Sequence, residues 1–358
     1  MQLIKDFFNA LADPRIFFFL TVAALVFMIW KRELFAKNAV GYGLLAFAAA
    51  FIVFGYFDEN FQLIILKPDN VPIVGLIFLL IFFTWYSIRE GVLNDQRIAA
   101  GKGPIEKEES DRVWVWPDLV YTELISLVLC SVVLIVWSIV LQAPLEQPAS
   151  QSATPNPSKA PWYFLGLQEM LVYFDPWLAG VVLPSLIIVG LIAIPYIDKN
   201  EKGNGYYTIA ERKAEITLFL FGFVILWCSL IILGTFLRGP NWNFFGPFEY
   251  WDTHKVEALT NVNLSEYIWV RGLGTGLPEF WLVREAFGIL FVLFYIFALP
   301  VILARGPFKH FYEKMGPARY YVGAFLFLSM MSLPIKMLLR WLFNLKYIVA
   351  IGEFFFNV

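Results

Sequence analysis

The sequence predicts an all-α, polytopic transmembrane protein with about 8 transmembrane helices. Of its 358 residues, 59% are hydrophobic and only 16% are charged. Soluble domains carry more charge and less apolar mass. Several apolar runs also reach about 20 residues, which is the length that crosses the hydrocarbon core of a bilayer. We therefore expect a multi-pass helical protein in a lipid bilayer, with most charged residues in the loops.

The apolar runs themselves define the expected spans. Prolines fall inside or near the ends of several of them, where neighbouring membrane helices can satisfy the freed carbonyl groups. No internal repeat stands out. The expected spans are 15–31, 39–56, 71–88, 118–142, 178–197, 215–237, 281–304 and 319–341.

The distribution of Lys and Arg predicts how these spans are oriented. The loops after the first, third, fifth and seventh spans hold most of the 27 Lys and Arg residues. Cytoplasmic loops carry an excess of positive charge, so we expect this side to face the cytoplasm. Both termini and the loop 143–177 then lie on the outer side of the membrane.

Cysteine and histidine are too few for a metal or haem site of the usual kinds. Cys130 and Cys228 stand alone in apolar runs, and the sequence has no CxxC or CxxCH motif. His254 and His310 fall in loops, so they cannot form a pair of haem ligands within the membrane. The net charge of −2 includes no basic patch interleaved with aromatic residues. We therefore expect no metal, no haem held by this chain and no nucleic-acid partner.

The loop 143–177 is long, rich in proline and aromatic, and it carries one Lys and no Arg. Loops of more than about 15 residues in compact proteins are usually functional or disordered. A simple linker would lack aromatic residues such as Trp162, Tyr163 and Trp177. These side chains favour either a binding site or a belt of aromatic residues at the membrane interface.

Between Trp116 and Asp198, several short motifs follow one another in the order that they have in a known protein family. They are "WPDLVY" at 116–121, "ATP" at 153–155, "APWY" at 160–163 and "FLGLQEMLVYFDPWLAGVVLPSLIIVGLIAIPYID" at 164–198. The stretch resembles the C-terminal half of cytochrome b, called subunit IV where the protein is split, from the quinol:cytochrome c oxidoreductases. "APWY" stands where the family has Pro-Glu-Trp-Tyr.

The resemblance implies a division of the chain and a set of partners. Residues 1–111 would be an N-terminal extension with three spans, 112–237 the subunit IV-like domain, and 238–358 an outer aromatic loop with two further spans. The expected setting is a dimeric, multi-subunit cytochrome bc-type complex in a bacterial cytoplasmic (inner) membrane. A cytochrome b N-terminal-half subunit with the b haems, a Rieske iron–sulfur protein and a c-type cytochrome would be the partners.

The same resemblance implies a shared quinol site on the outer side. Trp162 and Tyr163 match the motif and would line the pocket, together with Pro161 and Leu165. Pro161 occupies the position of the acid that relatives are taken to use as a proton acceptor. Proline has no side chain that can accept a proton, so another group has to serve.

Glu169 is the nearest candidate proton acceptor. In a regular helix it lies seven residues after Trp162, on nearly the same face and about 10 Å along the axis. A carboxylate in an apolar membrane helix is a functional candidate by default. The alternative is a structural acid that pairs with an arginine of a partner subunit.

Two acids near the start of the fourth span form a second candidate set. Asp118 and Glu123 lie on the expected cytoplasmic side, where the family reduces quinone, and they are candidates for proton uptake. The alternative is that both acids complement the dipole at the start of the helix.

Two other classes of function are the alternatives to this interpretation. A secondary transporter would have internal repeats and paired charges near the middle of the bilayer, which the sequence does not suggest. A non-catalytic membrane scaffold subunit is the other alternative, if Pro161 marks an inactive quinol site. The aromatic segment 238–252, which runs into the loop 239–279, lies outside the resemblance and is a candidate docking surface for a cytochrome c or a Rieske iron–sulfur head.

Overall fold

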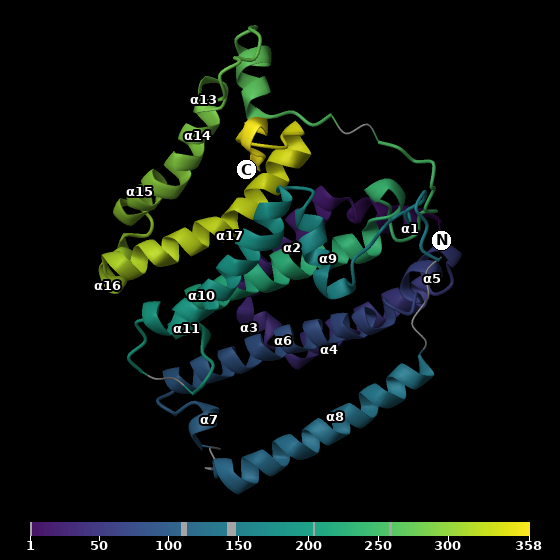
Figure 1. Ribbon diagram of the computed structural model, residues 1–358. Coiled ribbons are helices and arrows are strands. Elements are labelled where there is room, and N and C mark those ends of the chain that lie inside the picture. Colours follow the sequence, from purple (N-terminus) through teal and green to yellow (C-terminus); the bar gives the residue numbers. More distant parts are fainter. Residues whose placement is uncertain (1, 109–112, 142–147, 203–204, 258–259) are drawn as a thin grey trace. The chain divides into compact units, whose positions relative to one another are not determined.

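The computed structural model describes residues 2–108, 113–141, 148–202, 205–257 and 260–358, and these are helical for the most part (Figure 1). Among them, 7 helices are long and apolar enough to cross a membrane, or up to 8 if a bent pair counts as one span. This confirms the predicted all-α, polytopic transmembrane fold.

The bent pair is α1 (Gln2–Leu11) and α2 (Pro14–Trp30), which meet at 77°. Asp13 causes the break, since its side chain accepts hydrogen bonds from the backbone N–H groups of Arg15 and Ile16 and so caps α2. Proline follows as the first helical residue, where its missing N–H costs nothing. The predicted span 15–31 therefore corresponds to α2.

The remaining candidate spans agree with the predicted runs to within a few residues at most ends. They are α4 (Asn38–Gly55), α6 (Val71–Ala99), η1 and α8 (Val115–Leu119 and Val120–Val140), η2 and α10 (Leu178–Val182 and Leu183–Ile197), α11, η3, α12 and η4 (Ile209–Leu220, Phe221–Cys228, Ser229–Ile232 and Leu233–Leu237), α14, η7 and α15 (Ala286–Leu293, Phe294–Ala298 and Leu299–Arg305), and α17 (Pro317–Phe343).

Short elements connect these spans. A two-stranded antiparallel sheet near the C-terminus, with Ala350 opposite Asn357 and Ile351 opposite Phe356, was not predicted from the sequence. The short elements are α3 (Arg32–Phe35), α5 (Glu59–Ile65), α7 (Ile105–Glu108), α9 (Trp162–Met170), η5 (Pro240–Trp242), η6 (Glu266–Gly272), α13 (Trp281–Arg284), α16 (Lys309–Met315), β1 (Ala350–Ile351), η8 (Gly352–Phe354) and β2 (Phe356–Asn357).

The chain forms two compact units. Unit 1 comprises Met1–Trp162, Asn204–Ile225 and Thr235–Lys255, and unit 2 comprises Tyr163–Gly203, Leu226–Gly234 and Val256–Val358. The units follow spatial contacts, whereas the predicted division into 1–111, 112–237 and 238–358 follows the family resemblance and stays a prediction. The predicted boundary at 111 and residues 143–147 of the outer loop lie outside the described residues.

In unit 1, α6 continues to Ala99, well past its predicted end at residue 88. The polar end of this helix is held by Asn94, which is fully buried. The Asn94 amide donates to the Glu106 carboxylate and to the backbone carbonyl of Tyr207 at 3.0 Å. Asp95 accepts from the backbone N–H of Ala210 at 3.0 Å. These bonds fasten α7 and the start of α11 to the end of α6.

The opposite end of unit 1 joins the N-terminal segment to the segment 246–248. Asn9 Oδ1 accepts a hydrogen bond from the backbone N–H of Phe248 at 2.9 Å. The Phe248 ring is buried in an apolar cluster with Phe61 and Ile65. Lys5 donates to the carboxylate of Asp58. Burial by itself would raise the pKa of Asp58, but Lys5 and the backbone N–H of Phe61 hold it below its ordinary value.

In unit 2, α17 packs against α10, and each end of this pair is fastened. At one end, Arg319 Nε donates to the backbone carbonyl of Tyr196 at 2.9 Å. At the other end, Trp177 Nε1 donates to the backbone carbonyl of Asn357 at 3.1 Å. The C-terminal segment thereby lies beside the start of η2.

These contacts bear on the predicted topology. Within unit 1, the segments after the first, third and fifth spans bond to one another, and the N-terminal segment bonds to the segments after the second and sixth spans. Within unit 2, the segment before η2 bonds to the segment after α17. Segments predicted to share a side of the membrane thus meet within each unit. Which side faces the cytoplasm stays a prediction.

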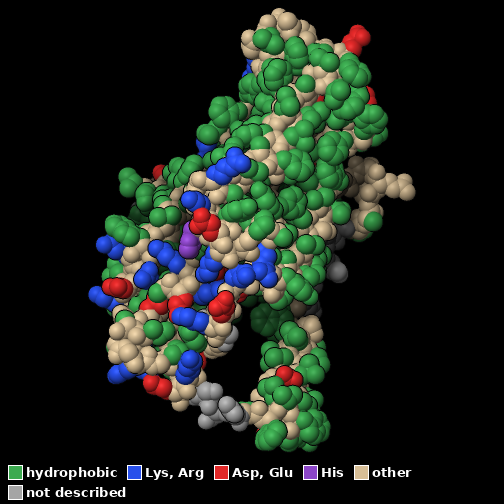
Figure 2. All heavy atoms as spheres, turned by 90° about the vertical axis from the view of Figure 1, so that its left-hand side faces the viewer, with side chains coloured by type: hydrophobic (Ala, Val, Ile, Leu, Met, Phe, Trp, Pro, Cys, Tyr) green, Lys and Arg blue, Asp and Glu red, His purple; other side chains and the backbone are tan. Residues whose placement is uncertain are grey.

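The surface is largely apolar. Figure 2 shows hydrophobic side chains over much of the visible face, with Lys and Arg gathered on one part of it. The clearest case is α8, in which no residue is buried. Apart from Val120, its leucine, valine and isoleucine side chains are exposed. Such faces are expected where helices contact lipid or other membrane helices.

Candidate functional site

Helix α9 carries most of the predicted quinol-site residues. It begins at Trp162, directly after Pro161, and ends at Met170, so the helix assumed between Trp162 and Glu169 is present. Its buried residues are Leu165, Gly166, Glu169 and Met170. The spacing i, i+1, i+4 and i+5 places these four on one face.

This buried face of α9 packs closely on the segment 226–234 of unit 2. A Cβ added to Gly234 would lie 3.0 Å from Leu165 Cγ, and a Cβ added to Gly166 would lie 3.4 Å from Ile231 Cγ1. The two glycines therefore allow the helices to approach each other closely. This contact fixes the rotation of α9 about its axis and thereby which of its side chains face the interior.

Glu169 lies on the buried face and is 0% exposed. The hydroxyl of Tyr173 donates to Glu169 Oε1 at 3.3 Å. Tyr173 is itself only 1% exposed, and its ring makes an edge contact with Trp341 of α17, with 6.0 Å between the ring centroids. A carboxylate and a phenol thus face each other in the interior, an arrangement that can hold or pass a proton.

Tyr163 lies on a different face from Glu169. Its side chain is 52% exposed, and its ring packs against Phe164 with a centroid separation of 4.7 Å. Trp162 is half-buried and Pro161 is exposed. The structure therefore brings Leu165 and Glu169 together on one face, but it does not bring the Tyr163 ring to the carboxylate.

The segment before α9 is fastened within unit 1 by a residue that the sequence analysis did not single out. Lys159 donates to the backbone carbonyl of Thr235 at 3.0 Å, and its ammonium lies 4.9 Å from the centroid of the Trp251 ring. Asn156 bonds to Asn241 at 2.9 Å. The signal for Lys159 was present in the sequence, because it is the only cation of the loop 143–177.

Asp175, at the end of the same loop, binds the C-terminal segment of unit 2. The Tyr347 hydroxyl donates to Asp175 Oδ1 at 3.0 Å, and the Asn357 amide donates to the same atom at 3.3 Å. Burial, followed by the hydrogen bond and charge of Asp175, raises the pKa of Tyr347 to about 12. Asp175 therefore holds the segment after α17 in place.

The second set of predicted residues lies on the surface. Asp118 is exposed in η1, and Glu123 is exposed in the first turn of α8. The backbone carbonyl of Asp118 accepts from the hydroxyl of Thr122 at 3.0 Å. Neither carboxylate forms an ion pair with the described residues.

The described residues include no group of three or more His, Cys, Asp and Glu side chains that could hold a metal ion. His254 is exposed and lies 3.2 Å from Asp252 Oδ1. A backbone hydrogen bond from His254 lowers the pKa of Asp252. His310 lies in α16, with its ring 6.0 Å from that of Phe311. The expectation that this chain ligates no haem stays a prediction.

Comparison with known proteins gives one family. Residues 148–247 match the family model described as cytochrome b(C-terminal)/b6/petD. No solved structure matches the chain. The match includes "APWY", α9 and α10, and it leaves out "WPDLVY" at 116–121. It also reaches into the loop 239–279, which sequence reasoning had left outside the family. Over residues 148–247, the chain is therefore similar to the cytochrome b C-terminal/b6/petD family, which confirms the resemblance predicted from the sequence.

Proposed function

We propose that the chain is the haem-free, subunit IV-like half of a split cytochrome b in a bacterial cytochrome bc-type complex. It would lie in the cytoplasmic membrane with a haem-bearing cytochrome b subunit, a Rieske protein and a c-type cytochrome. The observation that carries this proposal is the family match over 148–247, because it includes the quinol-site motif and the helix that follows. The chain would supply part of the outer quinol oxidation site, and partner subunits would hold the redox centres.

Quinol oxidation releases two electrons and two protons. A site for it needs apolar or aromatic walls for the ring and a group that accepts a proton. The half-buried Trp162 and the exposed Tyr163 stand at the start of α9 as the family motif has them. Their exposure supports contact with a quinol held between this chain and a partner subunit.

Glu169 is the proposed proton acceptor within this chain. It lies about 10 Å along α9 from Trp162, as seven residues of helix require. A quinol that contacts Trp162 cannot touch the carboxylate directly, so bridging water has to carry the proton between them. The Tyr173 hydroxyl orients the carboxylate. Glu169 therefore accepts the proton of the quinol hydroxyl through water and does not touch the hydroxyl itself.

On the other side of the membrane, Asp118 and Glu123 are proposed for proton uptake. Both are exposed at the start of the span formed by η1 and α8. Exposure allows exchange of protons with water, which uptake needs. Their distance from any haem is set by the partner subunit.

The experiment that tests the proposal is purification of the complex that contains this chain from its native membrane. We expect a b-type haem subunit and a Rieske protein to copurify, and the complex to reduce cytochrome c with quinol. A quinol-site inhibitor should bind and stop turnover. A complex without haem and without quinol oxidation would favour a secondary transporter, and an assembled haem-containing complex with no inhibitor binding here would favour a non-catalytic scaffold subunit.

A further inference from the structure

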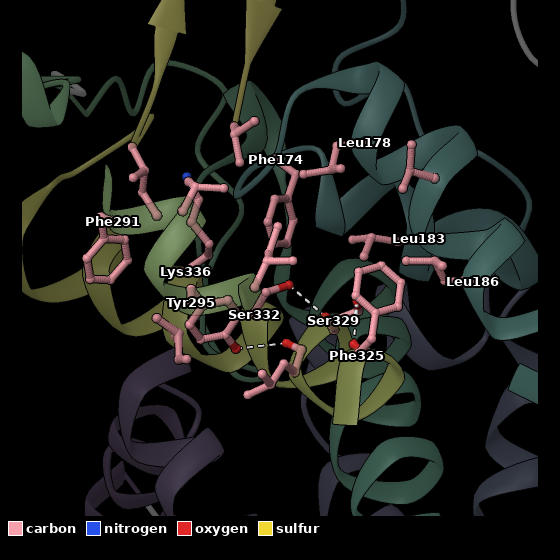
Figure 3. Close-up of a pocket in the computed structure, with 17 residues that line it drawn as sticks. Phe174, Leu178, Leu183, Leu186, Phe291, Tyr295, Phe325, Ser329, Ser332 and Lys336 are labelled. Atoms are coloured by element: carbon pink, nitrogen blue, oxygen red, sulfur yellow. Dashed lines mark hydrogen bonds between the residues drawn. The ribbon is translucent and has the colours of Figure 1, made fainter. Parts of the chain in front are cut away.

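Unit 2 contains an apolar pocket that the proposed quinol function does not use. It has a volume of about 190 Å³. Figure 3 shows its wall between Phe174, Leu183, Phe291 and Phe325, with Lys336 on the same wall. These residues come from the segment before η2, from α10, from α14 and from α17. None of the residues Trp162, Tyr163 and Glu169 lines it.

The charge of Lys336 is the unusual feature of this pocket. Its side chain is 2% exposed in a helix that can cross a membrane. The ammonium donates to the backbone carbonyl of Lys346, and it lies 5.6 Å and 5.8 Å from the ring centroids of Phe174 and Tyr347. Within the described parts of the chain, no carboxylate pairs with it. A buried charge without a counter-ion is costly, and an ionisable residue inside the membrane marks a functional site by default.

The surrounding charges add to the positive potential. Arg340 lies one turn after Lys336, and Arg340 and Lys346 both act on Lys336 electrostatically. Arg340 is 8% exposed, so its charge also lies within the protein. A negatively charged group at this end of the pocket would be stabilised by several cations.

The charged part and the apolar part of the pocket lie at different positions along α17. Lys336 lies seven residues before the end of the helix, about 10 Å from it. Its ammonium reaches the carbonyl of a residue beyond that end, as a snorkelling lysine does. The hydroxyls of Ser329 and Ser332, deeper in the helix, donate to carbonyls of α17 itself. The deeper part of the pocket therefore presents apolar surface, and the charge lies toward the membrane boundary.

The geometry points to an anionic phospholipid as the occupant of this pocket. We infer that its phosphate binds at Lys336 and that part of one acyl chain lies along α10 and α17. The volume supports a partial occupant, since sites that enclose a whole drug-sized ligand measure about 300–1,000 Å³. A dry apolar cavity of about 150 Å³ holds a group of the size of benzene. The inference does not depend on the proposed quinol function.

The test is native mass spectrometry of the purified full-length protein with dioleoyl phosphatidylglycerol or dioleoyl phosphatidylcholine, which carry the same acyl chains. The wild-type protein should bind one phosphatidylglycerol at least about tenfold more tightly, because both lipids present the same phosphate but the cations around Lys336 repel the quaternary ammonium of choline. Lys336→Met should reduce this preference to within about twofold, whereas Lys336→Arg should keep it. Lys309→Met, at an exposed lysine of α16, is the matched control and should leave it unchanged.

A second variant tests the apolar part and does not remove the charge. Val182→Phe places a larger side chain in the pocket wall. It should weaken the binding of both lipids by a similar factor. Equal binding of the two lipids to the wild type, or a preference that survives Lys336→Met, would overturn the inference. Displacement of phosphatidylglycerol by decylubiquinone in a manner that depends on Lys336 would also overturn it, since the pocket would then be a quinone site.

Discussion

The hydroxyl of Tyr173 lies 3.3 Å from Oε1 of Glu169, and both side chains are almost fully buried in unit 2. Residues four apart face each other on a helix, but α9 ends at Met170, so the turn at 171–173 brings the phenol back over the acid. This hydrogen bond distinguishes Glu169 from an exposed acid in the first turn of a helix. It gives the carboxylate a fixed orientation in an apolar interior.

Tyr173→Phe should slow quinol oxidation by about three- to tenfold in the assembled complex. The change removes one hydrogen bond to a carboxylate and leaves the ring in its contact with Trp341. The measurement is the steady-state rate with excess quinol and cytochrome c. The rate of a double variant with Glu169→Gln should equal that of Glu169→Gln alone, because the two residues act as one unit. If the rate loss of the double variant equalled the product of the two single losses, the pairing would be contradicted.

Tyr163→Ala should lower kcat/KM for quinol by about tenfold while the complex still assembles. The exposed ring is proposed to cover the quinol, and loss of such an apolar contact costs about 1.5–3 kcal/mol. Tyr196→Ala is the matched control, since Tyr196 is 73% exposed at the far end of α10. If both variants turn over like the wild type, Tyr163 does not line the quinol site.

The isolated chain should show no b-type haem absorbance after purification in detergent. The reason is that its histidines, His254 and His310, lie outside the candidate membrane spans and cannot provide an axial pair there. A reduced-minus-oxidised spectrum measures this directly. A stoichiometric b haem that stays on the chain would contradict the split cytochrome b proposal.

The C-terminal segment should loosen at low pH. The Arg284 guanidinium bonds to Glu353 at 2.8 Å and lowers the pKa of that carboxyl. The contribution of this pair is complete above the ordinary pKa of a glutamate and is lost as the pH falls through the lowered value. The protection of β1 and β2 against hydrogen exchange, measured relative to the intrinsic chemical rate at each pH, should therefore fall under acid conditions.

Glu353→Gln provides the control for this pH effect. The variant should exchange faster than the wild type at neutral pH, and its exchange should depend less on pH once the intrinsic chemical rate is removed. Because Glu353 is partly exposed, added salt should also reduce the difference. The same pH dependence in the variant and the wild type would assign the effect to another group.

The sequence alone predicted the membrane spans, because apolar runs of about 20 residues are typical of transmembrane helices. It could not show that α6 continues to Ala99, since that depends on the burial of Asn94 against Tyr207. It could not predict the pairing of β1 and β2 either, because two short strands are stabilised only by their surroundings.

The sequence likewise predicted part of the candidate site. Helical spacing placed Trp162 and Glu169 on nearly the same side, and the structure has Trp162 half-buried and Glu169 buried on α9. Spacing does not reveal which neighbours a face will meet. The contact with 226–234 and the hydroxyl of Tyr173 depend on the tertiary fold. The burial of Lys336 beside a pocket likewise needed the structure.

The central claim is that Glu169 accepts a proton from quinol in place of the acid that Pro161 removes. The most direct measurement is the steady-state rate of quinol oxidation by the intact complex between about pH 5.5 and 9 for Glu169→Gln, with Glu59→Gln at an exposed acid as the control. General-base contributions are typically about 100- to 10,000-fold, and partner routes compensate in part, so we predict at least about a tenfold loss with a changed pH profile and little change in quinol affinity. A Glu169→Gln complex with the wild-type rate and the wild-type pH profile would contradict the account and assign the proton exit to a partner subunit.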